Sequence, residues 1–288
     1  MSLPESSRAV MPSDALATWE TIAPALPDAL YLGGGTALAV HLHHRQSRDL
    51  DFFYHRGAVD LGALEGELRQ LGAFAVTQRT PGTLGGVFSE TKLQFLHADE
   101  RTPQHQLEPT SRLAGINVAG VGDLLAMKLK VVSERGELRD YFDIETIELR
   151  TGRRVEEGLG LLRERYGASA DSHLLGRVVR ALGYLDDVDE DHLLPESRRD
   201  IAAYWAKRQP DIIRSLGRVF GRPQKRAAGA PDSPNAPAAP QSRPSAIAGR
   251  IWVGPYRRRD GQPVRGHYRG CALPCPYLGR RGARAGPV

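Results

Sequence analysis

The chain has 288 residues, more than one typical domain, and 41% of them are hydrophobic, which is enough for a packed core. No run of about 18 apolar residues occurs, so no membrane-spanning helix is expected, and the N-terminus lacks the basic-then-apolar order of a secretion signal. The net charge of +5 is uneven, because 13 of the 39 Lys and Arg but only 2 of the 34 Asp and Glu residues fall from Arg222 onward. The basic character therefore belongs to the C-terminal tail, and it gives no reason to predict nucleic-acid binding by the body.

The predicted elements form a mixed-sheet half followed by a helical half. In chain order they are a helix over Asp14–Leu26 capped by Ser13, a strand over Leu30–Leu32, a helix over Thr36–His44, a strand over Leu50–Tyr54, a helix over Leu61–Leu71, strands over Phe74–Gln78, Leu84–Ser89, Lys92–Leu96 and Ile116–Val118, and helices over Asp123–Glu134, Glu137–Arg150, Glu156–Tyr166, His173–Leu185 and Arg198–Phe220. This order predicts an α+β fold with an α/β core over residues 1–120 and a helical extension over 121–221.

The C-terminal tail, residues 222–288, differs sharply in composition from the body. It holds 11 of the 20 prolines, and Gly, Ala and Arg make up much of the rest. Proline removes backbone donors and the apolar content is thin, so the tail is predicted to be disordered. It is either an inert extension, which the composition favours, or a basic arm that holds RNA or DNA by its phosphates.

Cysteine usage predicts neither a metal site nor disulfides. Cys271 and Cys275 lie in the tail, and their spacing has no companion pair of Cys or His, so a structural zinc site is not expected. Nothing indicates an oxidising compartment, and the expected location is the cytoplasm, without a membrane partner.

A glycine-rich turn is the first feature that suggests chemistry. Gly33, Gly34, Gly35 and Thr36 stand between a predicted strand and a predicted helix. Glycines let backbone N–H groups approach a phosphate closely, and the helix N-terminus favours negative charge. A tight turn between a strand and a helix also needs glycine for steric reasons alone, so the turn by itself does not distinguish the two explanations.

A pair of aspartates is the second such feature. Asp49 and Asp51 are two residues apart in a predicted strand, so their carboxylates would share a face, about 15 residues after the glycine turn. The repulsion between them would be relieved by a divalent cation, and Mg²⁺ binds carboxylates together with phosphate oxygens. Arg45 and Arg48 could hold a triphosphate or merely balance the aspartates. The alternative is an ordinary solvated strand face.

The third feature lies on two predicted helices. Lys128 offers a point charge to a phosphate, and Asp140 and Asp143 are three residues apart, hence on one helix face, where a carboxylate could accept a hydroxyl proton. The alternative is a set of helix-surface charges paired with Arg135 or Arg139.

Three ordered stretches of the sequence, YLGGGTALAVHLHHRQSRDLDFFY, QRTPGTLGGVFSETKLQFL and INVAGVGDLLAMKLKVVSERGELRDYFDIETI, resemble the AbiEii/AbiGii group of nucleotidyltransferase-like toxins. This group belongs to the polymerase-beta-like nucleotidyltransferase superfamily, and the resemblance runs from about Leu30 to Phe220. It implies a nucleotidyltransferase-like mixed sheet with flanking helices, completed by the helical half.

The resemblance also implies roles for the residues. It implies that Gly34, Gly35 and Thr36 cradle the nucleotide phosphates, that Asp49 and Asp51 bind the metal, that Lys128 contacts a phosphate, and that Asp143, with Asp140 close by, forms the later acidic motif. The implied protein is an Mg²⁺-dependent toxin that transfers a nucleotide from a nucleoside triphosphate to an acceptor, expected to be an RNA such as tRNA. Its implied partner is a cognate antitoxin protein.

One position departs from the family pattern. Superfamily enzymes generally carry a third carboxylate on a neighbouring strand, where this chain has Gln94. Asp99 and Glu90 lie near but outside the strand phase. Either two aspartates suffice for one Mg²⁺, or Asp140 or Asp143 substitutes, or catalysis has been lost. The alternatives to the toxin enzyme are therefore an inactive nucleotide- or antitoxin-binding module, and a small-molecule nucleotidyltransferase.

Overall fold

The computed structural model describes residues 3–55, 57–98, 106–167 and 172–220, together with the short segments 250–253, 256–257, 263–264 and 267–270. The chain divides into two compact units, Met1–Ile213 and Arg214–Val288. The first unit holds the sheet and nearly all the helices. Asp99, Cys271 and Cys275 lie outside the described residues.

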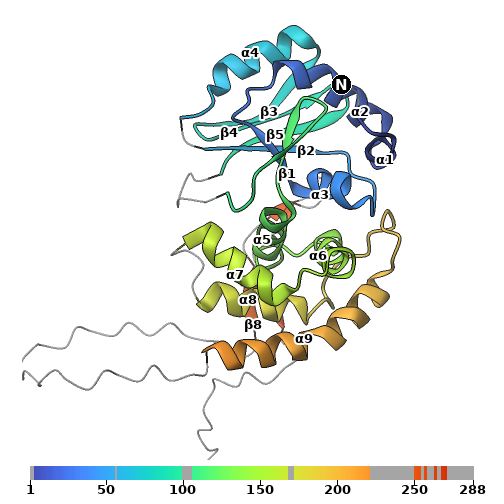
Figure 1. Ribbon diagram of the computed structural model, residues 1–288, viewed down its shortest axis with the longest axis vertical. Helices are drawn as coiled ribbons and strands as arrows, with labels where there is room; N and C mark the ends of the chain where they lie inside the picture. Colours follow the sequence, from blue (N-terminus) through green and yellow to red (C-terminus); the bar gives the residue numbers. More distant parts are fainter. Residues whose placement is uncertain are drawn as a thin grey trace, which may run out of the picture. The chain divides into compact units, whose positions relative to one another are not determined.

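A seven-stranded mixed sheet forms the upper part of the first unit as drawn in Figure 1. Its strands are β1 (Tyr31–Gly33), β2 (Leu50–Tyr54), β3 (Phe74–Thr80), β4 (Thr83–Phe88), β5 (Thr91–His97), β6 (Ser111–Leu113) and β7 (Ile116–Val118), in the spatial order β3-β4-β5-β2-β1-β7-β6. β2 pairs antiparallel with β1 and parallel with β5, and β1 pairs parallel with β7. β2 therefore lies at the centre of the sheet.

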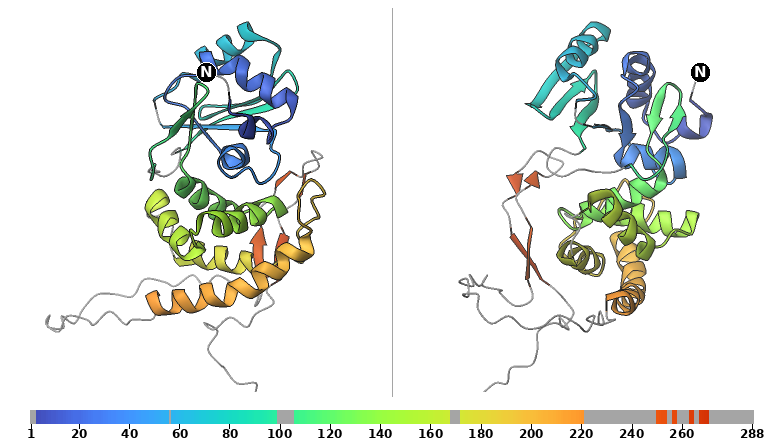
Figure 2. Two further views of the ribbon diagram at one scale, coloured as in Figure 1. Left: turned by 45° about the vertical axis from the view of Figure 1, so that its right-hand side comes forward. Right: turned by 60° about the vertical axis from the view of Figure 1, so that its left-hand side comes forward.

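The helices described in the structure are α1 (Glu5–Arg8), α2 (Ser13–Ile22), the 3-10 turn η1 (Ala23–Ala25), α3 (Gly34–Leu42), α4 (Leu61–Leu71), α5 (Val121–Val132), α6 (Leu138–Thr151), α7 (Val155–Tyr166), α8 (Ser172–Leu182) and α9 (Arg198–Phe220). Figures 1 and 2 show α5 to α8 as a group apart from the sheet, with α3 between the group and β1. The α+β class and the order of a sheet half followed by a helical half are as predicted.

The two faces of the sheet differ in burial. Leu50, Phe52 and Tyr54 alternate with the half-buried Asp51 and Phe53 along β2. Phe52 is fully buried and stacks on Phe95 of β5, with ring centroids 5.2 Å apart, on the face that packs against α2 and α4. The period of two in a central strand thus leaves the other face, with Asp51 and Phe53, turned toward the helical half.

A buried polar network fixes the helical half to the sheet. Arg165 of α7 donates to the Tyr31 hydroxyl of β1 at 2.9 Å and pairs with Asp123 of α5. Asp123 also accepts from the backbone N–H of Leu107 and of Glu108. Because both members of this buried ion pair make further hydrogen bonds, their desolvation is compensated and the orientation of α5 is defined.

Local structure differs from the predictions near the N-terminus. Pro12, not Ser13, occupies the N-cap position of α2, and no side chain caps the helix. Pro24 lacks a backbone donor, and the chain tightens into η1 after Ile22, where the sequence predicts a continuous helix to Leu26. The short α1 and the edge strand β6 were not predicted, because four and three residues are too few to show a period.

Most of the tail lies outside the described residues, so its predicted disorder stays a prediction. Four short strands are described there, β8 (Arg250–Val253), β9 (Tyr256–Arg257), β10 (Pro263–Val264) and β11 (His267–Gly270). β8 pairs with β11 and β9 with β10, both antiparallel. The sequence predicts no regular structure at these positions. Among the described residues, no helix combines the length and apolar character needed to span a membrane.

Candidate functional site

The glycine turn connects β1 to α3 and lies against β2. Gly34 has φ +65°, and a Cβ there would lie 2.6 Å from Oδ2 of Asp51. A Cβ at Gly35 would lie 2.6 Å from Nη2 of Arg45. Glycine is therefore required at Gly34 both for its backbone conformation and for the approach of Asp51. The turn and the second aspartate are in direct contact.

The two aspartates stand next to the turn at the start of β2. Gly33 and Asp51 are register partners between β1 and β2. The hydroxyl of Thr36 donates to the backbone carbonyl of Asp49 at 2.5 Å, and this bond holds the residue before β2 against α3. Burial raises the pKa of Asp51, and the charge of Asp49 raises it further. Asp51 is therefore harder to ionise than an exposed carboxyl group, both because it is desolvated and because it is repelled by Asp49.

The Thr36 side chain of the glycine turn is engaged within the protein, so only backbone groups of the turn could bind a phosphate. Thr36 is fully buried, and its hydroxyl also lies 2.8 Å from Oγ of Ser47. Both contacts are within the protein, so the hydroxyl secures the loop before β2 and is not available to a phosphate. The backbone of Gly34 and Gly35 is the part of the motif that a phosphate could approach.

Gln94 lies beside Asp51. The two residues are register partners between the parallel strands β2 and β5, and both are half-buried. The neighbouring-strand position that the superfamily pattern gives to a third carboxylate is therefore occupied by a neutral amide. Within the described ranges, no cluster of three or more His, Cys, Asp or Glu side chains could hold a metal ion.

Lys128 lies in a buried network of charges. Its Nζ is 2.8 Å from Oδ1 of Asp140 and 2.6 Å from Oδ2 of Asp143, and both carboxylates are fully buried. Asp143 also accepts from Nε of Arg45 at 2.6 Å, from Nη2 of Arg45 at 2.8 Å and from Nε2 of His44, 2.7 Å away. The loop before β2 is thereby tied to α5 and α6.

The pKa directions agree with this geometry. Burial would raise the pKa of Asp143, but Lys128, Arg45 and the hydrogen bond from His44 outweigh it and hold the pKa well below its usual range. The pKa of Asp140 is also lowered, because Lys128 and Arg135 outweigh burial. Burial lowers the pKa of His44, so the imidazole is neutral near pH 7 and donates from Nε2.

This network bears on two expectations, the proton acceptor role of Asp143 or Asp140 and the triphosphate contact of Arg45. Asp143 and Asp140 are fully buried, paired carboxylates of low pKa, so removal of a proton from an acceptor hydroxyl is not supported for either. Arg45 makes a bidentate pair with Asp143 instead of facing a triphosphate. Arg48 is exposed on the same loop. Asp140 and Asp143 orient Lys128, and Asp143 also orients Arg45.

Two cations near Asp51 were not singled out in the sequence. Lys92 and Arg135, with Lys128, partly offset the rise in the pKa of Asp51. Arg135 follows α5, its side chain is 46% exposed, and its Nε lies 3.9 Å from Oδ2 of Asp140, so it is only loosely paired there. Lys92 is exposed on β5, two residues before Gln94 and on the same face. The period-two placement of Lys92 was a signal available in the sequence.

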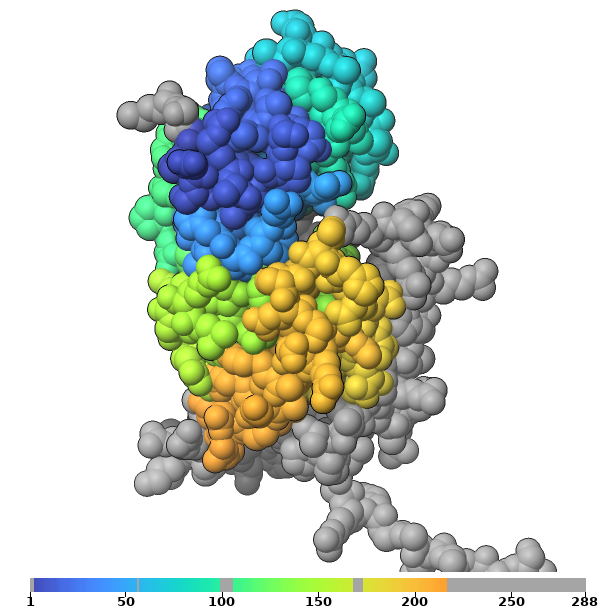
Figure 3. Space-filling model, turned by 90° about the vertical axis from the view of Figure 1, so that its right-hand side faces the viewer, coloured from blue at the N-terminus to red at the C-terminus, as the bar shows by residue number. Residues whose placement is uncertain are grey.

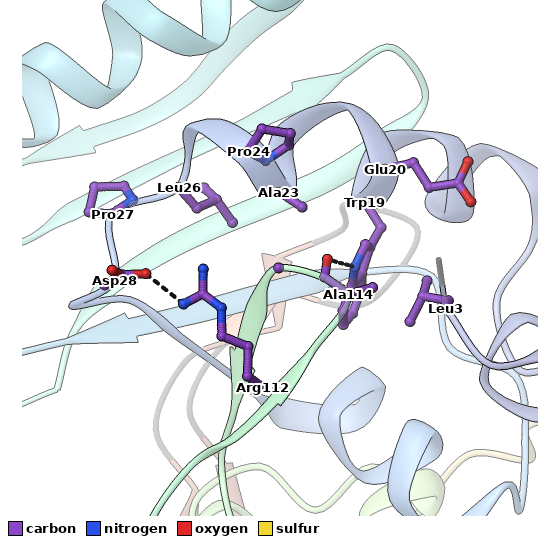
Figure 4. Close-up of a pocket in the computed structure, with 11 residues that line it drawn as sticks. Leu3, Trp19, Glu20, Ala23, Pro24, Leu26, Pro27, Asp28, Arg112 and Ala114 are labelled. Atoms are coloured by element: carbon purple, nitrogen blue, oxygen red, sulfur yellow. Dashed lines mark hydrogen bonds and ion pairs between the residues drawn. The ribbon is translucent and has the colours of Figure 1, made fainter. Parts of the chain in front are cut away.

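A separate hollow lies at the other side of the sheet. Figure 4 shows this pocket, of about 710 Å³, between α2, η1 and the turn that joins β6 to β7. Trp19 forms its buried wall and donates from Nε1 to the Ala114 carbonyl at 3.4 Å, while Arg112 pairs with Asp28 at 2.5 Å. None of the residues predicted to do chemistry lines this pocket. Figure 3 shows that the segment after α8 (yellow) lies beside the segment before β2 (light blue).

The glycine turn and the aspartate pair thus lie beside one central strand, and the charge of Lys128 acts on Asp51. The sequence matches a family model described as "Nucleotidyl transferase AbiEii toxin, Type IV TA system" over residues 16–219. The chain belongs to this AbiEii family of nucleotidyltransferase toxins. It is therefore a nucleotidyltransferase of a toxin–antitoxin family.

Two further similarities were found. The uncharacterized protein aq_aa25 of Aquifex aeolicus (strain VF5) is 27% identical over 176 residues, which is 61% of this chain and 80% of that protein. A crystal structure from H. pylori, described as a candidate nucleotidyltransferase, aligns with a TM-score of 0.46 and 19% identity, covering 72% of this chain and 98% of that chain.

Proposed function

We propose that the protein transfers a nucleotide from a nucleoside triphosphate to an RNA acceptor, and that Asp49 and Asp51 are the catalytic carboxylates. The observation that carries this proposal is the contact between Asp51 and the turn, where a Cβ at Gly34 would lie 2.6 Å from Oδ2. A bound phosphate chain would reach the carboxylates and the backbone of the turn together.

The aspartate pair fits a divalent cation. Burial and the charge of Asp49 raise the pKa of Asp51, which means that ionisation of both groups is unfavourable unless positive charge is added. Mg²⁺ commonly binds to proteins through one or two carboxylates and completes its shell with water and phosphate oxygens. Asp49 and Asp51 would hold such an ion, which when bound supplies charge neutralisation on the triphosphate and lowers the pKa of an attacking hydroxyl.

The remaining residues bind and orient the substrate. Lys128 has three N–H donors and uses two on Asp140 and Asp143, so one is left to meet a phosphate oxygen. The carboxylates fix the ammonium in position, which reduces the reorganisation needed during transfer. Arg135 and Lys92 add positive charge at the rim. Arg45 acts through Asp143 and is a positioning residue.

The family supports a class of partner, and the acceptor is part of the proposal. Membership of a type IV toxin–antitoxin family supports an antitoxin partner. RNA, tRNA in particular, is proposed as that acceptor. A small-molecule acceptor is distinguished by incubating the protein with labelled nucleoside triphosphates and a cell extract. Label recovered with RNA supports the proposal, and label recovered only with small metabolites contradicts it.

One observation favours a second candidate, a nucleotide-binding module without catalysis. Gln94 stands beside Asp51 where a third carboxylate would strengthen metal binding. Calorimetry with each triphosphate plus Mg²⁺, run beside the transfer assay, separates the two functions. Binding together with transfer supports the enzyme, whereas tight binding with no transfer to any acceptor supports the module.

A further inference from the structure

The face of β2 that carries Asp51 also carries an unusual aromatic side chain. Phe53 is two residues further along, so it emerges on the same face, about 6–7 Å from Asp51. It is half-buried, whereas Phe52 on the opposite face is fully buried. The Phe53 ring is thus partly exposed to solvent beside a polar site, and it is not buried in the hydrophobic core.

The surroundings of Phe53 join it to the glycine turn. A Cβ at Gly33 would lie 2.6 Å from Cε2 of Phe53 and 3.1 Å from Cε of Met127, so the ring and the thioether meet over the first glycine of the turn. Met127 is half-buried on α5, next to Lys128. Phe53 and Met127 therefore form an apolar surface next to the backbone of Gly34 and Gly35, which is the part of the turn proposed to face the phosphates.

The ring is also held in place. Tyr31 is the register partner of Phe53, and the two rings stack with centroids 5.9 Å apart. The Tyr31 hydroxyl accepts from Nη2 of Arg165 at 2.9 Å, so Tyr31 is fixed at both ends. A preorganised aromatic ring loses little conformational freedom when a flat ligand stacks on it.

We propose that Phe53, supported by Met127, is the contact surface for the nucleobase of the nucleoside triphosphate. This inference rests on the proposed function, because it places the base relative to phosphates bound at the turn and at Asp51. Nucleobases stack on aromatic side chains, and sulfur adds polarizable contact at the ring edge. Because stacking on an aromatic ring does not depend on which base is present, this surface is expected to accept any of the four bases.

Binding measurements on the full-length protein test the proposal. Inorganic tripolyphosphate offers the same phosphates without a base, so both it and the four nucleoside triphosphates are titrated with Mg²⁺ present. The wild type is expected to bind at least one nucleoside triphosphate about tenfold more tightly than tripolyphosphate. In Phe53→Ala that advantage disappears, while the affinity for tripolyphosphate stays within about twofold.

Two further variants separate contact from folding. Phe53→Tyr keeps the ring and should retain the advantage of the nucleoside triphosphate. Phe53→Leu keeps apolar volume without the ring and should lose most of it, at an unchanged melting temperature. Asp51→Asn should weaken tripolyphosphate and nucleoside triphosphates alike.

The outcomes distinguish this inference from the proposed function. Equal wild-type affinities for tripolyphosphate and all four nucleoside triphosphates would overturn the base surface and leave the phosphate site standing. Equal loss of both ligands in Phe53→Ala and Phe53→Leu would also overturn it, since the ring would then only support the phosphate site. A wild type that binds none of these ligands would contradict both proposals.

Discussion

Asp143 is a buried carboxylate whose charge is balanced by Lys128 and Arg45 and which also accepts a hydrogen bond from the neutral His44. Removing its charge leaves Lys128 and Arg45 buried with fewer partners, and breaking a buried ion pair from one side typically costs about 3–5 kcal/mol. Asp143→Asn is therefore expected to lose stability on this scale, as measured by urea unfolding. A loss of less than about 1 kcal/mol would show that the network contributes little.

Glu145 of α6 predicts a pH dependence of stability. Burial, followed by the charges of Glu196, Glu148 and Asp200, raises its pKa to about 8, and its Oε2 has no hydrogen-bond partner in the described part of the chain. The folded state therefore holds a proton that the unfolded state releases near pH 4.5. The associated stability is complete below pH 4.5 and is lost as the pH rises toward 8.

Glu145→Gln removes this dependence. The variant should match the wild type near pH 4.5 and become more stable by a few kcal/mol at most near pH 8, since a tenfold change in proton affinity corresponds to about 1.4 kcal/mol. Unfolding free energies measured across this range give the difference between the two proteins. A difference that stays constant with pH would contradict the raised pKa.

At the scale of elements, the turn from β1 to α3 depends on Gly34. Its φ of +65° strains any other residue, and a Cβ would meet Oδ2 of Asp51 at 2.6 Å. Gly34→Ala should lower stability by about 1–2 kcal/mol and should also displace Asp51, so that binding of Mg²⁺-triphosphate is lost. Gly66→Ala is a matched control, because it lies on α4 with no atom within 4 Å of the new Cβ. Equal behaviour of the two variants would show that the turn has no special role.

The helices and strands that could be predicted from the sequence are those with a regular repeat of apolar residues or a capping residue. α4 covers the predicted Leu61–Leu71, with Leu61, Leu64 and Leu68 buried in one stripe and Asp60 as its N-cap. Leu71 is the last residue of the helix and is 41% exposed. β2 likewise covers its predicted range, since alternation in a half-buried strand is a strong signal.

The candidate site was only partly predictable. Local spacing indicated that Asp49 and Asp51 lie close to the glycine turn. It could not show that Arg45 and Asp143 pair across 98 residues of sequence, because such contacts depend on how α6 packs. For this reason the sequence did not predict that Asp143 and Arg45 pair with each other. The charge of Arg135 near Asp51 is likewise a tertiary feature, whereas that of Lys92 follows from its place two residues before Gln94.

At the scale of the whole molecule, the tail is predicted to be dispensable. The family match ends at residue 219, and the sheet and site lie in the unit Met1–Ile213. A protein truncated after Gly221 should keep its melting temperature within about 2 °C and its transfer rate within about twofold. A large loss of transfer with unchanged stability would instead support the tail as a basic arm for a nucleic-acid acceptor.

The central claim is that the aspartate pair at the glycine turn performs nucleotide transfer. The most direct test is the initial rate of label transfer from nucleoside triphosphates, compared between Asp51→Asn and the matched control Asp28→Asn. Asp28 has an 83% exposed side chain outside the site, and the charge of Asp51 is unfavourable in the fold, so both variants should remain folded. We expect the rate to fall at least about 1,000-fold in Asp51→Asn and to stay within about twofold in Asp28→Asn. Comparable rates in the wild type and a folded Asp51→Asn protein would contradict the account.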